Sequence, residues 1–241
     1  VRSSSTREDQ EGESAAGLHQ SVLGVRTEQE LFDAARTCWA SALAPSALAY
    51  HRNAARRGEE GAGLGIVVQA MVPADVAGAM FTVNPLSGDP GELVVNASWG
   101  LGCAVMDGRV SPDTYRVDKG SGWVRDRVLG DKALAVRWEA ARGLTDTQVP
   151  DEDRERACLD DATLESLVTL ALRIEDHFDA ACAVEWALAG GTLHILQARP
   201  VTALATPPRR RRGRRRRSAR ERARLVWSNV NVGEALPGVA T

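Results

Sequence analysis

The sequence has 241 residues, of which 44% are hydrophobic, and its formal net charge is −2. A chain of this length and apolar content can bury a substantial core, in one domain or in two small ones. No apolar run approaches the roughly 20 residues that span a membrane, and no basic stretch followed by an apolar one marks a signal peptide, so neither feature is supported.

The chain opens with a polar segment, residues 1–17 (VRSSSTREDQEGESAAG), which is rich in serine, glutamate and glycine. Because it shows little apolar periodicity, the segment is predicted to be a loop. The first residue is Val1 and not methionine, so we expect a further segment upstream of it.

A helix is predicted over residues 27–57. Thr27 and Glu30 have the spacing of a capping box, in which the hydroxyl and the carboxylate each satisfy a free backbone N–H. Apolar side chains then recur every four residues and predict one buried face, made of Leu31, Ala35, Trp39 and Leu43.

Buried strands are predicted next, because the sequence becomes mostly apolar and β-branched. Two strands, LGIVVQAMV (64–72) and VAGAMFTV (76–83), are separated by a short turn, and a third, ELVVNASW (92–99), comes after the turn SGDPG. Shorter strands are predicted over residues 114–118, 123–129 and 132–138.

An irregular stretch, a helix and a hairpin complete the body of the chain. Residues 139–160 are polar and show no periodicity. Asp161 opens a helix with an apolar stripe of Leu164, Leu167, Val168, Ala171, Ile174 and Phe178. Strands over 182–188 and 193–198 flank Gly190-Gly191. The fold class is therefore predicted to be α+β, with a mixed, mostly antiparallel sheet and packed helices.

A strongly basic segment comes after this body. Residues 209–224 hold 11 of the 30 basic residues but only one of the 32 acidic ones, so the rest of the chain is acidic. Such charge density predicts a disordered linker over 207–224, and residues 225–241 read as the start of a further domain. Eleven arginines could also bind a phosphate backbone. However, no interleaved aromatic residue or recognition fold supports a nucleic-acid partner.

Glu185, Gln197 and Arg199 form the first candidate site, on the predicted hairpin. A lone carboxylate on a strand is more often solvated than a ligand. An odd-length loop, Gly190-Gly191-Thr192, would set Glu185 opposite Gln197 on one face, whereas a two-residue Gly190-Gly191 turn would place them on opposite faces. We predict the odd loop, because the pair then offers oxygen ligands suited to Mg²⁺. Arg199 would point to the same side and could bind phosphate.

A second candidate site combines Arg2 and its neighbouring serines with Gly17 and Ser21. An arginine beside hydroxyls and a glycine suits a polyphosphate, although such a segment is more often a solvated loop. Gln69 is a third candidate, because it lies in an otherwise apolar strand and a buried amide needs partners. It could face a nucleotide or bond a neighbouring backbone, and the sequence leaves both open.

Several other kinds of site have no support in the sequence. No GxxxxGK[ST] or GxGxxG motif is present, so neither a Walker nor a Rossmann nucleotide site is indicated. The histidines show no ligand spacing, and the four cysteines (Cys38, Cys103, Cys158 and Cys182) form no CxxC pair. Free thiols in a reducing cytoplasm are therefore expected.

Six segments occur together in an order that resembles one family. They are VRSSSTREDQEGESAAG, IVVQAMVPADVAGAMFTVNPLSGD, NASWGLG, GRVSPDTYRVDK, VEWAL and LHILQARPVT. Residues 1–206 resemble the ATP-binding domain shared by phosphoenolpyruvate synthase, pyruvate phosphate dikinase and rifamycin phosphotransferase. The segment WSNVNVGEALPG resembles the stretch after this domain in the rifamycin phosphotransferase branch.

The resemblance implies an ATP-grasp fold over residues 1–206 that binds ATP and Mg²⁺, here without its N-terminal part. It also implies a role for each residue that matches a family motif. Arg2 and Arg199 would contact the phosphates and would be the catalytic residues, and Gly17 and Ser21 would contact the nucleotide. Gln69 would lie on the adenine side, and Glu185 and Gln197 would bind magnesium.

The implied reaction passes a phosphoryl group from ATP to a histidine on a mobile domain and then to an acceptor, here pyruvate or a rifamycin-like molecule. Three departures bear on it. The family's lysine-bearing segment would precede Val1, Cys103 stands where glutamate is usual, and none of the four histidines lies in the phosphohistidine motif. We therefore expect a phosphotransferase fragment. The histidine that accepts the phosphoryl group would lie outside this sequence, for example on a separate chain. The alternative is a catalytically inactive nucleotide-binding or interaction module.

Overall fold

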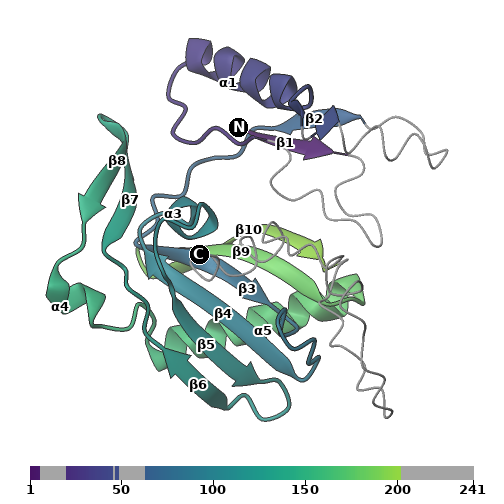
Figure 1. Cartoon of the computed structure of the whole chain (residues 1–241), viewed down its shortest axis with the longest axis vertical. Helices are drawn as coiled ribbons and strands as arrows, with labels where there is room; N and C mark the ends of the chain where they lie inside the picture. Colours follow the sequence, from purple (N-terminus) through teal and green to yellow (C-terminus); the bar gives the residue numbers. More distant parts are fainter. Residues whose placement is uncertain (6–19, 46, 49–62, 202–241) are drawn as a thin grey trace, which may run out of the picture.

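The computed structural model describes residues 1–5, 20–45, 47–48 and 63–201. These residues form one large sheet, two small sheets and packed helices, so the predicted α+β class is confirmed (Figure 1). Gly17, the predicted linker over 207–224 and the segment 225–241 lie outside the described residues.

The large sheet has six strands in the order β10-β9-β3-β4-β5-β6, and all neighbouring pairs are antiparallel. The apolar and β-branched runs of the sequence form these strands, as predicted. Their bounds are β3 (Val76–Phe81), β4 (Glu92–Trp99), β5 (Asp113–Asp118), β6 (Val124–Val128), β9 (Cys182–Ala189) and β10 (Thr192–Pro200).

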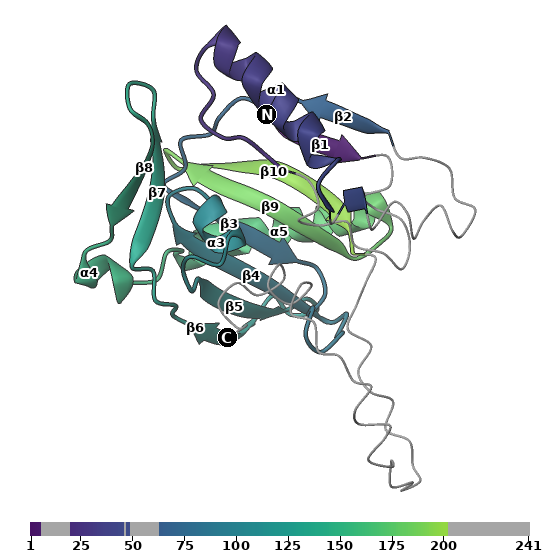
Figure 2. The same cartoon turned by 45° about the horizontal axis from the view of Figure 1, so that its top comes forward.

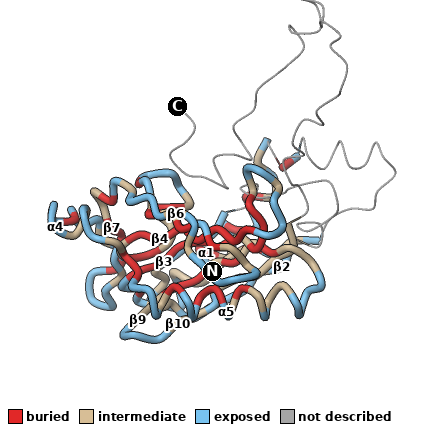
Figure 3. The backbone as a smooth tube through the Cα atoms, turned by 90° about the horizontal axis from the view of Figure 1, so that it is seen from below, coloured by how far each residue is buried: buried red, intermediate tan, exposed pale blue. Residues whose placement is uncertain are grey.

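Helix α5 (Asp161–Phe178) covers one face of this sheet. Asp160 is its N-cap, and the carboxylate of Asp160 accepts a hydrogen bond from the backbone N–H of Thr163 at 2.8 Å. The predicted stripe is buried at Leu164, Leu167, Val168 and Ala171. The main core therefore lies between α5 and the sheet, where buried residues gather along the central strands (Figure 3).

A smaller layer is built from the N-terminal residues. Strand β1 (Arg2–Ser5) pairs antiparallel with β2 (Leu64–Val67), and helix α1 (Glu28–Ser41) packs on them. The predicted loop over residues 1–17 is thus wrong for Arg2–Ser5, because pairing with β2 makes a strand where apolar periodicity is absent. In Figures 1 and 2 this layer lies beyond the edge strand β10 of the large sheet.

The predicted buried face of α1 is wrong for Trp39 and Leu43, whereas Leu31 and Ala35 are half-buried. Trp39 and Leu43 are 54% and 70% exposed, whereas the buried residues are Ala34, Cys38 and Ser41. Small side chains let the helix approach the two-stranded sheet closely, and a sheet of that width covers only one side of the helix.

A separate hairpin combines the strand predicted over residues 132–138 with a second strand in the stretch 139–160, which is predicted to be irregular. Strand β7 (Leu134–Glu139) pairs with β8 (Gly143–Gln148), and two short helices, α3 (Cys103–Met106) and α4 (Asp151–Arg154), lie nearby in the chain. Strand β8 has the sequence GLTDTQ, which carries almost no apolar signal. Its strand conformation is a consequence of pairing with β7.

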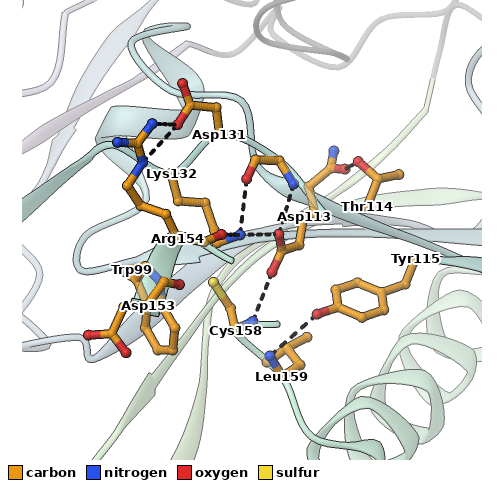
Figure 4. A network of polar contacts seen from close by, with 12 residues as sticks. Trp99, Asp113, Thr114, Tyr115, Asp131, Lys132, Asp153, Arg154, Cys158 and Leu159 are labelled. Carbon is orange, nitrogen blue, oxygen red and sulfur yellow. Dashed lines mark hydrogen bonds and ion pairs between the residues drawn. The ribbon is translucent and has the colours of Figure 1, made fainter. Parts of the chain in front are cut away.

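Lys132 and Asp113 form an ion pair in which both side chains are fully buried (Figure 4). Lys132 Nζ donates to Asp113 Oδ1 at 2.6 Å and to the carbonyl oxygens of Gly130 and Arg154 at 3.0 and 2.8 Å. Its three N–H groups therefore all have acceptors. The Asp113 carboxylate also accepts from the backbone N–H groups of Gly130 and Cys158. This satisfied network ties β5 to the segments before β7 and after α4.

Two acidic groups beside this ion pair, Tyr115 and Cys158, are neutral. Burial is the main cause that raises the pKa of Tyr115 to about 12, and it also raises the pKa of the Cys158 thiol. The Tyr115 hydroxyl accepts from the backbone N–H of Leu159 at 3.4 Å. Because both acidic groups keep their protons at neutral pH, neither adds a negative charge beside the Lys132–Asp113 pair.

Gly78 allows β3 and β4 to approach closely. A Cβ on Gly78 would lie 1.9 Å from the carbonyl oxygen of Asn96, so one strand would have to move. Gly78→Ala is therefore expected to lower the free energy of unfolding by about 1–3 kcal/mol in urea denaturation. Gly65→Ala is the control, because its Cβ would meet the Ser4 carbonyl at an ordinary 3.6 Å. A change below about 0.5 kcal/mol in Gly78→Ala would contradict the close approach.

Candidate functional site

Glu185 and Gln197 lie directly opposite each other on β9 and β10. Residues paired in this way point to the same face of a sheet. Val184 and Trp186, the neighbours of Glu185, are buried in the core beneath α5, so Glu185 and Gln197 occupy the other face. The predicted shared face of the two side chains is confirmed.

The loop that produces this pairing differs from the prediction. Thr192 pairs with Ala189, so the turn consists of Gly190 and Gly191 alone. Both glycines have positive φ, 52° and 78°, as a two-residue type I′ turn requires. The predicted odd-length loop is therefore wrong, and from this turn alone Gln197 would fall on the opposite face from Glu185.

A β-bulge restores the predicted face. The register shifts between Ile195 and Gln197, which leaves Leu196 as the extra residue without a partner on β9. Before the shift Trp186 pairs with Ile195, and after it Glu185 pairs with Gln197. A bulge that accommodates one extra residue moves all later side chains of the strand to the other face.

Arg199 joins this pair on the same face. It lies opposite Ala183, two residues from Gln197, and successive side chains of a strand alternate. All three polar side chains are half-buried. Their common face therefore carries a carboxylate, an amide and a guanidinium, which are groups that bind a divalent cation and a phosphate.

The structure also brings Arg2 and Ser21 together. They form an isolated antiparallel bridge, and the terminal amino group of Val1 donates to the Val22 carbonyl at 2.8 Å next to it. Arg2 is half-buried and Ser21 is exposed. Both residues belong to the small layer, on the side of β10 away from β9 (Figures 1 and 2).

Gln69 lies outside any strand, because β2 ends at Val67. Its side chain is exposed, and its Nε2 donates a hydrogen bond to the carbonyl oxygen of Leu196 at 3.2 Å. The expectation of a buried amide within a strand over residues 64–72 is therefore wrong. Of the two roles that the sequence leaves open, a bond to a neighbouring backbone is the one observed.

The oxygen atoms that Glu185 and Gln197 offer on this face are of the kind that Mg²⁺ prefers. Among the described residues, no group of three or more His, Cys, Asp or Glu side chains is arranged to enclose a metal. Mg²⁺ is commonly bound by one or two carboxylates together with substrate phosphates and water, so a closed protein cage is not needed. Glu185 and Gln197 could supply two oxygens of such a site.

Cys103 differs in chemistry from the glutamate that the family resemblance leads us to expect there. It begins α3 and is half-buried. Burial, together with the charge of Asp107, raises the pKa of its thiol. The thiol is thus neutral at physiological pH and supplies no negative charge at this position.

Sequence comparison gives the class of the protein, which is an AMP/ATP-binding domain. The chain belongs to the family described as pyruvate phosphate dikinase, AMP/ATP-binding domain, which matches residues 1–219. None of the described helices is long and apolar enough to cross a membrane.

Three relatives illustrate the range of the similarity. A probable phosphoenolpyruvate synthase of Methanothermobacter thermautotrophicus is 38% identical over 204 residues, which is 85% of this chain and 29% of that protein. The prodigiosin synthesizing transferase PigC of Serratia marcescens is 34% identical over 244 residues, 100% of this chain and 27% of PigC. The uncharacterized phosphotransferase YvkC of Bacillus subtilis is 34% identical over 204 residues, 85% of this chain and 24% of YvkC. The chain thus spans less than a third of each relative.

Proposed function

We propose that this chain binds Mg²⁺ and ATP in an ATP-grasp arrangement and presents the ATP for phosphoryl transfer. The observation that carries the proposal is the pairing of Glu185 with Gln197 on the face of the β9–β10 hairpin opposite α5. Membership of an AMP/ATP-binding domain family supports the same ligand.

Each side chain of the hairpin has a distinct part in this proposal. Glu185 and Gln197 hold Mg²⁺ through oxygen atoms, and the remaining ligands come from phosphates and water. Arg199 binds the phosphates through its planar fork of N–H groups. When bound, Mg²⁺ neutralises charge on the transferring phosphoryl group, and the protein contributes mainly by positioning.

The small N-terminal layer supplies the second side of the proposed site. Arg2 contacts the phosphates, and Gly17 and Ser21 line the nucleotide. The bridge between Arg2 and Ser21 supports a joint role, because it holds the two backbones together. Gln69 comes from the chain segment that leads from this layer to the large sheet.

The proposed reaction transfers a phosphoryl group from ATP to a histidine of another domain or chain, and then to pyruvate or a rifamycin-like acceptor. The relatives carry names for different products, phosphoenolpyruvate and prodigiosin. Since both of them match this chain, the part that they share with it supports nucleotide use and does not select the acceptor.

A catalytically inactive nucleotide-binding module is the second candidate, and Cys103 favours it. The neutral thiol cannot replace the charge of a glutamate. The two candidates differ in turnover. A phosphotransferase consumes ATP and water when the phosphohistidine domain of a relative is added, and it forms AMP, free phosphate and one phosphoryl group bound to the histidine. A binding module leaves ATP intact.

Isothermal titration with ATP tests the proposed function. We expect binding in the presence of excess Mg²⁺ and a much weaker signal in EDTA, because the phosphates then lose the bridging cation. The titration of GTP under the same conditions serves as a control for base selectivity. Absence of ATP binding in Mg²⁺ by the folded chain would rule the proposal out for this chain.

A further inference from the structure

The contact between Gln69 and the bulge at Leu196 has a consequence for the magnesium ligands. On the turn side of the bulge, Ile195 pairs with Trp186. If β10 continued in that register, Leu196 would face Glu185, and Gln197 would point toward the α5 side. Gln197 reaches Glu185 only because Leu196 is left out of the pairing.

A bulge at this place must be stabilised by other contacts, because regular pairing of β9 and β10 would form the backbone hydrogen bonds without it. Two contacts provide it. The side chain of Leu196 packs against the second core cluster, which includes Ala77, Leu101 and Val136. The carbonyl oxygen of Leu196 accepts a hydrogen bond from Nε2 of Gln69. The first contact is apolar and nondirectional, whereas the second fixes the orientation of the Leu196 peptide group.

We propose that Gln69 is a positioning residue for the magnesium site and acts by holding the Leu196 bulge, an inference that rests on the proposed function. The amide of Gln69 keeps the Leu196 carbonyl turned out of the ladder and thereby keeps Gln197 beside Glu185. Gln69 lies between β2 and β3, so the same bond also fixes the segment that connects the small layer to the hairpin.

This role differs from a contact with the adenine base, which the family resemblance implies for Gln69. A residue that reads only the base affects nucleotides and leaves base-free polyphosphates unaffected. A residue that sets the metal ligands affects every ligand that binds through Mg²⁺. Inorganic tripolyphosphate has the phosphates of ATP but neither ribose nor base, so it separates the two roles.

The test compares Gln69→Leu, which removes the donor, with Gln148→Leu, which removes an exposed glutamine at the end of β8. Titrations with Mg-ATP and with Mg-tripolyphosphate are run on the full chain. In Gln69→Leu we expect both affinities to fall by about 10- to 100-fold and the Mg²⁺ concentration for half-saturation to rise, as when an outer partner of a metal ligand is lost. Gln148→Leu should match the wild type.

Unchanged tripolyphosphate affinity in Gln69→Leu, with weaker ATP binding, would overturn the inference in favour of a base contact. A second measurement needs no ligand. Hydrogen exchange of the β10 amides around Leu196 should accelerate in Gln69→Leu while α5 stays protected, and unchanged exchange there would also overturn the inference. If the exchange responds but the wild type binds neither ligand, then the proposed function fails while the contact between Gln69 and the bulge stands.

Discussion

Replacing Glu185 with glutamine is expected to abolish Mg²⁺-dependent ATP binding without unfolding the chain. Glutamine keeps the size of the side chain and one oxygen but removes the negative charge that a divalent cation requires. The affinity for Mg-ATP should fall by more than about 100-fold. This loss is larger than the one usually caused by removing a residue that only hydrogen-bonds to a metal ligand. Because Glu185 is only half-buried and glutamine keeps its size and hydrogen-bonding capacity, the unfolding free energy should change by less than about 1 kcal/mol.

Isothermal titration in Mg²⁺ and in EDTA measures this effect. Glu165→Gln is the matched control, because Glu165 is an exposed glutamate on the outer side of α5. It makes the same change of charge away from the hairpin and should bind as the wild type does. Wild-type affinity in Glu185→Gln would show that the carboxylate does not hold the metal.

Lys132→Met is expected to cause the largest loss of stability, about 3–5 kcal/mol. The substitution leaves the Asp113 carboxylate buried without its counter-charge, and the Gly130 and Arg154 carbonyls each lose a donor. Urea denaturation followed by tryptophan fluorescence measures the change. Lys132→Arg should also destabilise, because the planar guanidinium cannot place three donors as the ammonium group does.

Lys119→Met provides the comparison for this prediction. Lys119 Nζ donates to both carboxylate oxygens of Glu175 at 2.6 and 2.7 Å, but the two side chains remain 14% and 27% exposed. Water can solvate the remaining carboxylate, so a loss of only about 1 kcal/mol is expected. A cost for Lys132→Met as small as that for Lys119→Met would contradict the account of the buried network.

Apolar periodicity predicts the parts of the fold whose own side chains form the core. The strands of the large sheet and the stripe of α5 belong to this group, because burial there depends on the local sequence. Strands β1 and β8 could not be predicted from apolar periodicity, because they are polar and their strand conformation depends on pairing with β2 and β7. The buried face of α1 is misplaced because small residues, and not the large ones, pack on the small sheet.

For the candidate site, the shared face of Glu185 and Gln197 could be predicted from the sequence, but the strand register that produces it could not. The sequence indicates that Glu185 and Gln197 belong on one face, and the structure agrees. The turn and the bulge could not be predicted, since either an odd loop or an even turn with a bulge after it gives the same result. The bulge contacts Gln69 and the core residues around Leu196, most of which are far from the hairpin turn in the chain.

The sequence contains one weak indication that Lys132 has a specific structural role. Lys132 and Lys119 are the only lysines in a chain rich in arginine. Both form ion pairs in the structure. The residue type alone does not reveal the partner, because Asp113 comes from another strand.

Paramagnetic relaxation by Mn²⁺ tests most directly whether Glu185 and Gln197 hold the cation with ATP. The measurement records the side-chain amide signals of a ¹⁵N-labelled chain, with the signal of Gln197 identified by its loss in Gln197→Glu. Addition of Mn²⁺ with ATP should broaden the Gln197 signal strongly and leave that of Gln148, at the end of β8, sharp. A sharp Gln197 signal under saturating Mn-ATP would contradict the proposed metal site.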